Sequence, residues 1–196
     1  MRDKIDEIIQ TIFDVYRLRG DEAYDGEPVS QLEHAVQSAV RAKQERSGDP
    51  EFILAAFLHD FGHIYASPEY PVESMDGYGV WRHEEKGGAV LHALCFSDKV
   101  VRLVANHVRA KRYLVSADAS YYAQLSDASK ITLEKQGGPM TIVEQREFAC
   151  DPWFELHLNL RRLDEKAKVE GVEVGNLAWL KDLMRDHLSI QMPKLR

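Results

Sequence analysis

Four histidines and two aspartates in this chain have the side-chain types and surroundings suited to metal chemistry. Imidazole nitrogens and carboxylate oxygens together favour iron, manganese or zinc over magnesium alone. Adjacent residues on a helix point about a hundred degrees apart, so His59 and Asp60 cannot chelate one ion by themselves. A shared site requires ligands from other helices, and Asp60 could then bridge two metals. The six residues are His34, His59, Asp60, His83, His107 and Asp164.

Each of these residues also has a simpler explanation. A His–Asp dipeptide can be an ordinary hydrogen-bonded pair at a helix end, and a single histidine is more often a core or surface residue than a ligand. We assign His92, His157 and His187 to that ordinary class. The six residues favour a metal site because they occur together and in this order along the chain.

The stretch that carries His59 and Asp60 predicts a buried helix over residues 49–61. Asp49 and Pro50 are an N-cap and a first-turn proline, and an almost continuous apolar run follows them. Gly62 is the expected terminator of this helix. Polar side chains at the end of a buried helix are costly unless they are paired or bound to metal.

Further segments have helical apolar spacing, and we find no convincing strand pattern and no internal repeat. The helices are expected over residues 3–18, 30–46, 83–95, 98–111, 121–135, 151–168 and 176–190. Ser30 and Glu33 form a capping-box pattern at the start of the second of these, which turns Leu32, Ala35, Val36, Ala39 and Val40 inward. We therefore expect one all-α domain over residues 1–196, with residues 20–29 as an active-site loop and 64–82 as a possible lid.

Composition limits the classes of partner and the compartment. The net charge is −7 and no long basic block is present, which disfavours nucleic-acid binding. No apolar run approaches the ~20 residues that span a membrane. We interpret Cys95 and Cys150 as small core residues of a protein in a reducing compartment. Because we find no signal-peptide pattern, we expect a cytoplasmic protein. No sequence feature indicates an oligomeric state.

Cationic and hydroxyl side chains at helical spacing could form an anion-binding site beside the metal ligands. Residues three or four positions apart on a helix share a face, with Cβ atoms about 6 Å apart. A lysine one turn beyond a metal ligand can grip an anion that also touches the metal, and an arginine can bind it through a charge-assisted fork. The pairs with this spacing are His107 with Lys111, Arg161 with Asp164, Ser129 with Thr132, and Asp60 with His63.

The order H…HD…H…H…D along the chain resembles the HD-domain superfamily, whose fold is a helical bundle. Residues 24–27 (YDGE), 31–34 (QLEH) and 59–63 (HDFGH) are similar to its mixed-valent diiron oxygenases, which include myo-inositol oxygenase. Residues 125–133 (LSDASKITL) and 136–140 (QGGPM) resemble the organophosphonate-cleaving branch, the PhnZ and TmpB type. This likeness covers nearly the whole chain.

The resemblance implies an Fe(II)/Fe(III) pair as cofactor and O2 as co-substrate. Asp60 would be shared between the two irons, and Tyr24 would occupy an iron site in the resting enzyme until substrate displaces it. By the likeness, one iron is held by His34, His59, Asp60 and Asp164, and the second by Asp60, His83 and His107.

The resemblance also implies the substrate, a 1-hydroxy-2-(amino or trimethylammonio)ethylphosphonate. Cleavage of its C–P bond would give glycine or glycine betaine plus phosphate, and the sequence is compatible with either nitrogen. Glu27 would accept the cationic nitrogen, and Tyr65, Tyr78 and Trp81 could add cation–π contacts. The groups suited to the phosphonate oxygens are His63, Lys111, Ser129, Thr132 and Arg161.

The ordinary explanations of these residues stay open at this point. Lys111 is by default a solvated charge, and Arg161 an ion-pair partner of a residue three or four positions away. Ser129 and Thr132 are often plain helix-surface residues. Tyr24 can simply pack on the core.

Two other functions are also compatible with the metal ligands. One is a metal-dependent phosphohydrolase on the same fold, against which the loop with Tyr24 and Glu27 argues. The other is a non-catalytic, metal-stabilised sensing module. That alternative predicts that Lys111→Ala and Arg161→Ala change no measurable property except solubility.

Overall fold

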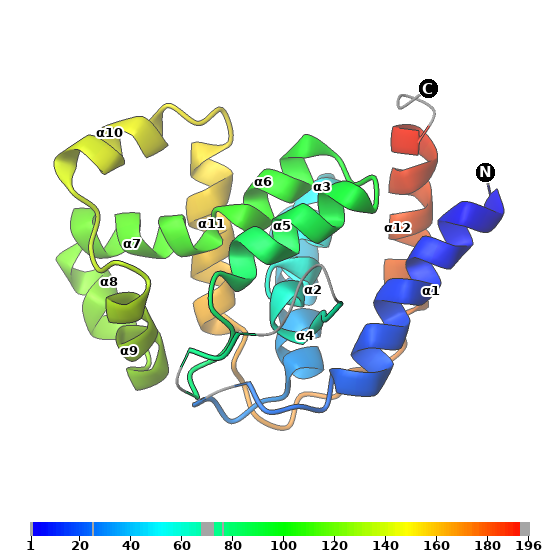
Figure 1. Ribbon diagram of the computed structural model, residues 1–196, viewed down its shortest axis with the longest axis horizontal. Coiled ribbons are helices and arrows are strands. Elements are labelled where there is room, and N and C mark those ends of the chain that lie inside the picture. The colour runs from blue at the N-terminus through cyan, green and yellow to red at the C-terminus, as the bar shows by residue number, and fades with distance from the viewer. Residues whose placement is uncertain (1, 25, 68–72, 76, 193–196) are drawn as a thin grey trace.

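The computed structural model describes residues 2–24, 26–67, 73–75 and 77–192. Within these ranges the chain is built of helices, with isolated bridges between Ala23 and Ser30 and between Ser74 and Val80. The prediction of an all-α, single-domain helical bundle is confirmed (Figure 1). The helices are α1 (Arg2–Arg19), α2 (Gln31–Glu45), α3 (Pro50–Leu58), α4 (Phe61–Ile64), α5 (His83–Ala93), α6 (Asp98–Ala105), α7 (His107–Ala117), α8 (Ala119–Gln124), α9 (Asp127–Lys135), α10 (Ile142–Ala149), α11 (Phe154–Lys166) and α12 (Ala178–Gln191).

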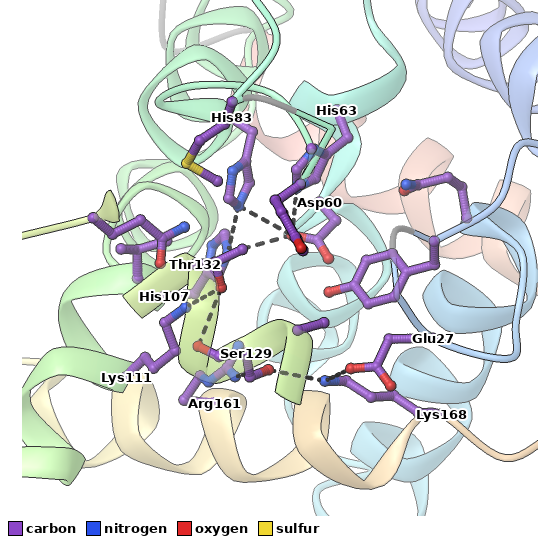
Figure 2. A pocket seen from close by; sticks show the side chains of 18 residues that line it. Glu27, Asp60, His63, His83, His107, Lys111, Ser129, Thr132, Arg161 and Lys168 are labelled. Carbon is purple, nitrogen blue, oxygen red and sulfur yellow. Dashed lines mark hydrogen bonds and ion pairs between the residues drawn. The ribbon is translucent and has the colours of Figure 1, made fainter. Parts of the chain in front are cut away.

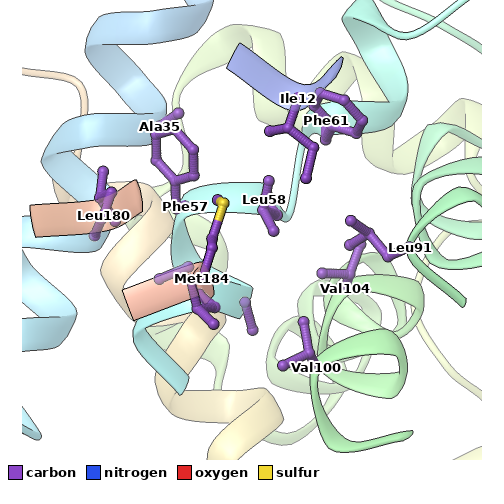
Figure 3. Packing of buried hydrophobic residues seen from close by; sticks show 14 of the residues in the cluster. Ile12, Ala35, Phe57, Leu58, Phe61, Leu91, Val100, Val104, Leu180 and Met184 are labelled. Carbon is purple, nitrogen blue, oxygen red and sulfur yellow. The ribbon is translucent and has the colours of Figure 1, made fainter. Parts of the chain in front are cut away.

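Helix α3 is the centre of the main core. Every residue from Phe52 to Leu58 is buried, and the helix contacts α2, α6, α11 and α12. A helix covered on all sides must be apolar all round, which accounts for its sequence. Figure 3 shows Phe57 and Leu58 among side chains of the surrounding helices, with Ile12, Ala35, Val100, Val104, Leu180 and Met184 labelled.

The expected end of this helix at Gly62 is wrong. Helix α3 stops at Leu58, and Gly62 lies inside the short helix α4. A Cβ atom at Gly62 would lie only 2.0 Å from the carbonyl oxygen of His83 and 2.9 Å from the backbone nitrogen of Gly87. Glycine is therefore needed for the close approach of α4 to α5, which brings His83 towards Asp60.

Other helix boundaries differ from the prediction where the chain turns. The expected helix 98–111 is broken at Asn106, so His107 is the first residue of α7, and the expected helix 121–135 is divided into α8 and α9. Helix α11 begins at Phe154 because Asp151 Oδ1 accepts a hydrogen bond from the backbone N–H of Trp153 and holds 151–153 in a turn. Helix α10 was not predicted.

Three side chains expected in the core are more exposed than predicted. Val40 is 39% exposed on the outer face of α2, since α3 and α11 cover the opposite face of that helix. Cys150 is exposed after α10, and Cys95 is partly exposed in the turn after α5. The capping box of Ser30 and Glu33 is confirmed.

A second, smaller core lies beside the first. It is formed by residues of α7, α8, α10 and α11 and their connections: Ala110, Leu114, Tyr121, Leu125, Met140, Phe148 and Leu158. Helix α11 belongs to both cores, since Leu160 and Leu163 face the main one. In Figure 1, α8, α9 and α10 lie on one side of the molecule, and α1 and α12 lie on the other. None of the described helices combines the length and apolar character that crossing a bilayer requires.

Candidate metal centre and substrate pocket

The six predicted metal ligands lie together at the centre of the molecule. They come from α2, the turn after α3, the first residues of α5 and α7, and α11, and none is more than 6% exposed. Their ligand atoms form two groups in which all atoms lie within 4.8 Å of one another. One group is His34, His59 and Asp164, and the other is Asp60, His83 and His107. We call these two candidate sites the metal groups.

Backbone carbonyl groups orient all four imidazole rings. A carbonyl oxygen only accepts hydrogen bonds, so each Nδ1 that contacts one must carry the ring proton. This leaves the Nε2 lone pair of every ring directed towards the other ligands, as in protein metal sites. The contacts are His34 with Ala167 at 3.0 Å, His59 with Ala56 at 2.9 Å, His83 with Val80 at 3.2 Å and His107 with Val104 at 2.8 Å.

The two oxygens of Asp60 face different groups. Oδ2 lies 3.4 Å from Nε2 of His34 and 3.2 Å from Nε2 of His59. Oδ1 lies 3.4 Å from Nε2 of His83 and 3.3 Å from Nε2 of His107 (Figure 2). A carboxylate in this position can contribute one oxygen to each of two ions.

The buried carboxylates and the facing imidazole nitrogens of the site favour the binding of cations. Oδ2 of Asp60 and Oδ1 of Asp164 are buried without a hydrogen-bond partner, which is costly unless a positive charge compensates them. The Nε2 atoms of His34 and His59 face each other at 3.1 Å, and those of His83 and His107 at 3.0 Å. Two lone pairs at such distances need a proton or a metal ion between them. The donor set therefore fits two metal ions.

The pKa shifts of His34 and Asp60 also come from the packing of buried histidines against buried carboxylates. Burial lowers the pKa of His34, but the attraction of its protonated ring to the carboxylates of Asp164 and Asp60 outweighs burial and raises it to about 9. Burial raises the pKa of Asp60, yet the charge of His59 and a hydrogen bond from His107 hold it well below its usual value. Without metal, protons on histidine compensate the carboxylates, and a metal ion would supply that compensation instead.

A cavity of about 50 Å³ adjoins the Asp60 group. Its walls come from the 20–29 loop, the segment before α5, and helices α7, α9 and α11. The structure brings every predicted substrate residue to this cavity, although the roles stay predictions: Glu27, His63, Lys111, Ser129, Thr132 and Arg161 all line it, together with Tyr24. Sequence reasoning missed Lys168, which also lines the cavity.

Lys111 and Arg161 are both buried. Lys111 is 3% exposed and donates to Thr132 Oγ1 at 3.0 Å, and burial lowers its pKa well below that of ordinary lysine. Its interpretation as a solvated charge is therefore wrong. Arg161 forms ion pairs with Asp164 and Glu165, as its ordinary explanation predicted. It also lines the cavity.

His63 is held as a hydrogen-bond donor towards the cavity. The backbone N–H of Val80 donates to its Nδ1 at 3.1 Å, so the ring proton lies on Nε2, 4.0 Å from Asp60 Oδ1. Burial and the charge of the stacked His83 ring lower the pKa of His63 well below its usual value, which keeps it neutral. Gly79 packs on this ring with φ +93°, and a Cβ atom there would lie 2.6 Å from it.

The loop residues lie against the metal groups. The Tyr24 ring stacks on His34 with centroids 4.2 Å apart, and burial and the charge of Asp60 raise the tyrosine pKa well above its usual value.

Asp25 of the motif lies outside the described residues, as do residues 68–72 and 76 of the expected lid. Of the three aromatic residues expected near a substrate cation, Tyr78 lines the cavity, while Trp81 is 45% exposed.

A helical bundle with two buried His/Asp groups on either side of one carboxylate has the ligand set of a metalloenzyme. No family model matches the chain. It is 42% identical over 167 residues to the 1-hydroxy-2-(trimethylamino)ethylphosphonate dioxygenase (glycine-betaine-forming) of Leisingera caerulea, covering 85% of this chain and 83% of the relative. It is 40% identical over 171 residues to the hydroxymethylphosphonate dioxygenase of Gimesia maris, covering 87% and 83%.

A third relative is the uncharacterized protein L432 of Acanthamoeba polyphaga mimivirus, 35% identical over 181 residues, with 92% of this chain and 82% of that protein covered. The chain therefore belongs to the phosphonate dioxygenase family. It is an oxygenase that cleaves C–P bonds, and the resemblance to the organophosphonate-cleaving branch of the HD-domain oxygenases is confirmed.

Proposed function

We propose that this protein is a mixed-valent diiron dioxygenase that converts a 1-hydroxyphosphonate and O2 into a carboxylic acid and phosphate. The observation that carries the proposal is the pair of His/Asp groups sharing Asp60 beside a cavity lined by buried Lys111 and Arg161. The candidate substrates are 1-hydroxy-2-aminoethylphosphonate, its trimethylated analogue and hydroxymethylphosphonate. Their organic products would be glycine, glycine betaine and formate.

The metal ligands in this proposal are the six buried residues of the two groups. His34, His59, Asp60 and Asp164 would hold one iron, and Asp60, His83 and His107 would hold the other, with Tyr24 as a resting-state ligand. Iron is preferred to zinc because the reaction of a dioxygenase is redox chemistry. When bound, the iron pair supplies the activation of O2 for attack at C1 of the substrate.

The chain's own residues bind and orient the phosphonate. Lys111 and Arg161 neutralise its charge, and the hydroxyl groups of Ser129 and Thr132 lie within the same wall of the cavity. His63, protonated on Nε2, donates a hydrogen bond and does not act as a base. These contacts fix C1 next to the metals and exclude water from the reacting carbon.

Tyr24 and Glu27 connect substrate binding to the metals. Tyr24 lies in the cavity wall and against His34, so a substrate that displaces it would open a coordination position only when the cavity is filled. Glu27 is the carboxylate available to a cationic nitrogen at the far end of the substrate. We therefore propose residues 20–29 as the active-site loop, while the possible lid over residues 64–82 stays a prediction.

The proposal requires one O2 for each C–P bond, because carboxylic acid and phosphate together hold two oxygen atoms more than the substrate. We expect equal amounts of O2 consumed and phosphate released from a hydroxyphosphonate under air. Phosphate release from nucleotides under nitrogen, without O2 uptake on any hydroxyphosphonate, would instead identify a phosphohydrolase. Unchanged turnover in Lys111→Ala and Arg161→Ala would contradict the roles given to these cations.

The location and partners complete the proposal. We infer a cytoplasmic enzyme, since Cys95 and Cys150 are both free thiols. The partner is the small-molecule phosphonate, and no nucleic acid or membrane is involved.

A further inference from the structure

Lys168 forms an ion pair in the wall of the cavity. It lies two residues beyond the end of α11, and its Nζ donates to Glu27 Oε1 at 2.8 Å (Figure 2). The side chains of Lys168 and Glu27 are only 9% and 8% exposed. Ser126 also donates to Oε1 of Glu27, at 2.5 Å. The charge of Glu27 is therefore already neutralised by a lysine of the chain itself.

Lys168 also occupies the aromatic surface beside Glu27. Its Nζ lies 5.9 Å from the centroid of the Tyr24 ring. A carboxylate and an aromatic face are the two groups that recognise an alkylammonium ion. Among the described residues that line the cavity, the only other carboxylate is Asp60, which lies between the histidines. A substrate ammonium would thus need the groups that Lys168 contacts.

We propose that Lys168 is a specificity-determining residue that competes with the cationic end of the substrate for Glu27 and Tyr24. The inference rests on the proposed function. A phosphonate with an ammonium group must displace Lys168 before it can bind fully. A phosphonate without nitrogen, such as hydroxymethylphosphonate, binds with the Glu27–Lys168 pair intact. Lys168 therefore sets the preference between these two classes of substrate.

Displacement leaves Lys168 with other partners. Its Nζ lies 3.5 Å from Glu165 Oε2 and 3.2 Å from Ser129 Oγ. A small movement of the lysine away from Glu27 can keep both contacts, so exchange does not strand a buried charge. Two ammonium groups cannot share Glu27 without repulsion, which makes the exchange competitive rather than additive.

The test is Lys168→Met, which removes the charge and retains much of the side-chain volume. Binding of hydroxymethylphosphonate and of 1-hydroxy-2-aminoethylphosphonate to the iron-loaded protein is measured under nitrogen by titration calorimetry. We expect the ratio of their dissociation constants to move about 10-fold or more in favour of the aminated compound. The aminated compound should also raise the melting temperature of the variant more than that of the wild type.

Matched controls separate this effect from a general change. Lys166→Met removes an exposed charge two residues away and should leave the ratio unchanged. Lys168→Arg keeps the charge and should stay near the wild-type ratio. In a Glu27→Gln background, Lys168→Met should no longer change the ratio, because the contested carboxylate is gone.

Two results would overturn the proposal. One is a ratio that Lys168→Met changes less than about 2-fold, and the other is an equal loss of affinity for both compounds, which would place Lys168 in phosphonate binding. Turnover of the wild type under air distinguishes these results from failure of the proposed function. Wild-type protein that consumes no O2 with any hydroxyphosphonate would reject the proposed function and this inference with it.

Discussion

The metal groups and the far end of the substrate cavity are built in different ways. At the metal groups, backbone carbonyls of Ala56, Val80 and Val104 orient the rings of the histidines three residues later in the chain. At the far end, Glu27 and Lys168 hold one another by side-chain contacts between a loop and the segment after α11. The first arrangement is fixed by backbone groups close in the chain, while the second depends on a contact between two long side chains.

This difference separates the chemistry from the choice of substrate. The metal groups are supported by the main core around α3, in which Phe57 and Leu58 are fully buried. The cavity wall is completed by α9, which lies beside the smaller core. Two relatives of similar identity are named after different phosphonates. A rigid metal centre with an adjustable cavity wall can serve both substrates without altering the reaction.

The strongest test of the comparison is to remove the shared carboxylate. Asp60→Ala should lose both metal ions and lower kcat by about 1000-fold or more, because Asp60 faces both groups. Iron content by mass spectrometry and O2 uptake are the measurements. His92→Ala, at an exposed histidine, is the control and should keep its iron. A variant that retains two irons per chain would show that Asp60 is not a ligand.

Gly62→Ala tests whether helix packing positions the metal groups. The added Cβ would meet backbone atoms of His83 and Gly87, so we expect the free energy of unfolding to fall by about 2–3 kcal/mol, with weaker metal binding. Urea unfolding gives the first quantity and iron content the second. Gly48→Ala, where no atom lies within 4 Å of the added Cβ, is the control. Equal stability of the two variants would rule out this role for Gly62.

Lys111→Met should affect the substrate cavity and leave the metal groups unchanged. We expect KM for the phosphonate to rise about 10- to 100-fold, the value of a charge-assisted contact, while iron content stays at the wild-type level. Because burial lowers the pKa of Lys111, its charge should be lost at a lower pH than in ordinary lysine. The wild-type KM should therefore rise as pH increases, and the variant should lack this dependence. Loss of iron would mean that the metal groups and the substrate cavity cannot be changed independently.

Thr132→Val should give the smallest effect. The substitution removes the hydroxyl that accepts a hydrogen bond from Lys111, with little change in shape. We expect KM to rise about 2- to 10-fold and kcat to change little, in line with one neutral hydrogen bond. Steady-state kinetics over a range of phosphonate concentrations measures both. A larger effect than that of Lys111→Met would reverse the order of importance that the cavity suggests.

Much of the helical content and the full set of metal-ligand candidates could be predicted from the sequence. Helical spacing is a local property, and the capping box at Ser30 marked the start of α2 correctly. The same pattern at Thr141 and Glu144 marks the start of α10, and it could have revealed the helix that was missed. The break at Asn106 was not predictable, because apolar spacing continues across it.

The sequence by itself determined which six side chains could bind metal, since their types and their places near apolar residues of predicted helices are encoded locally. Only the tertiary structure decided that Gly62 serves a helix contact, that Lys111 is buried, and that Glu27 faces a lysine 141 residues away. Such contacts depend on how helices and loops meet in space. Local spacing carries no information about a pair so distant in the chain.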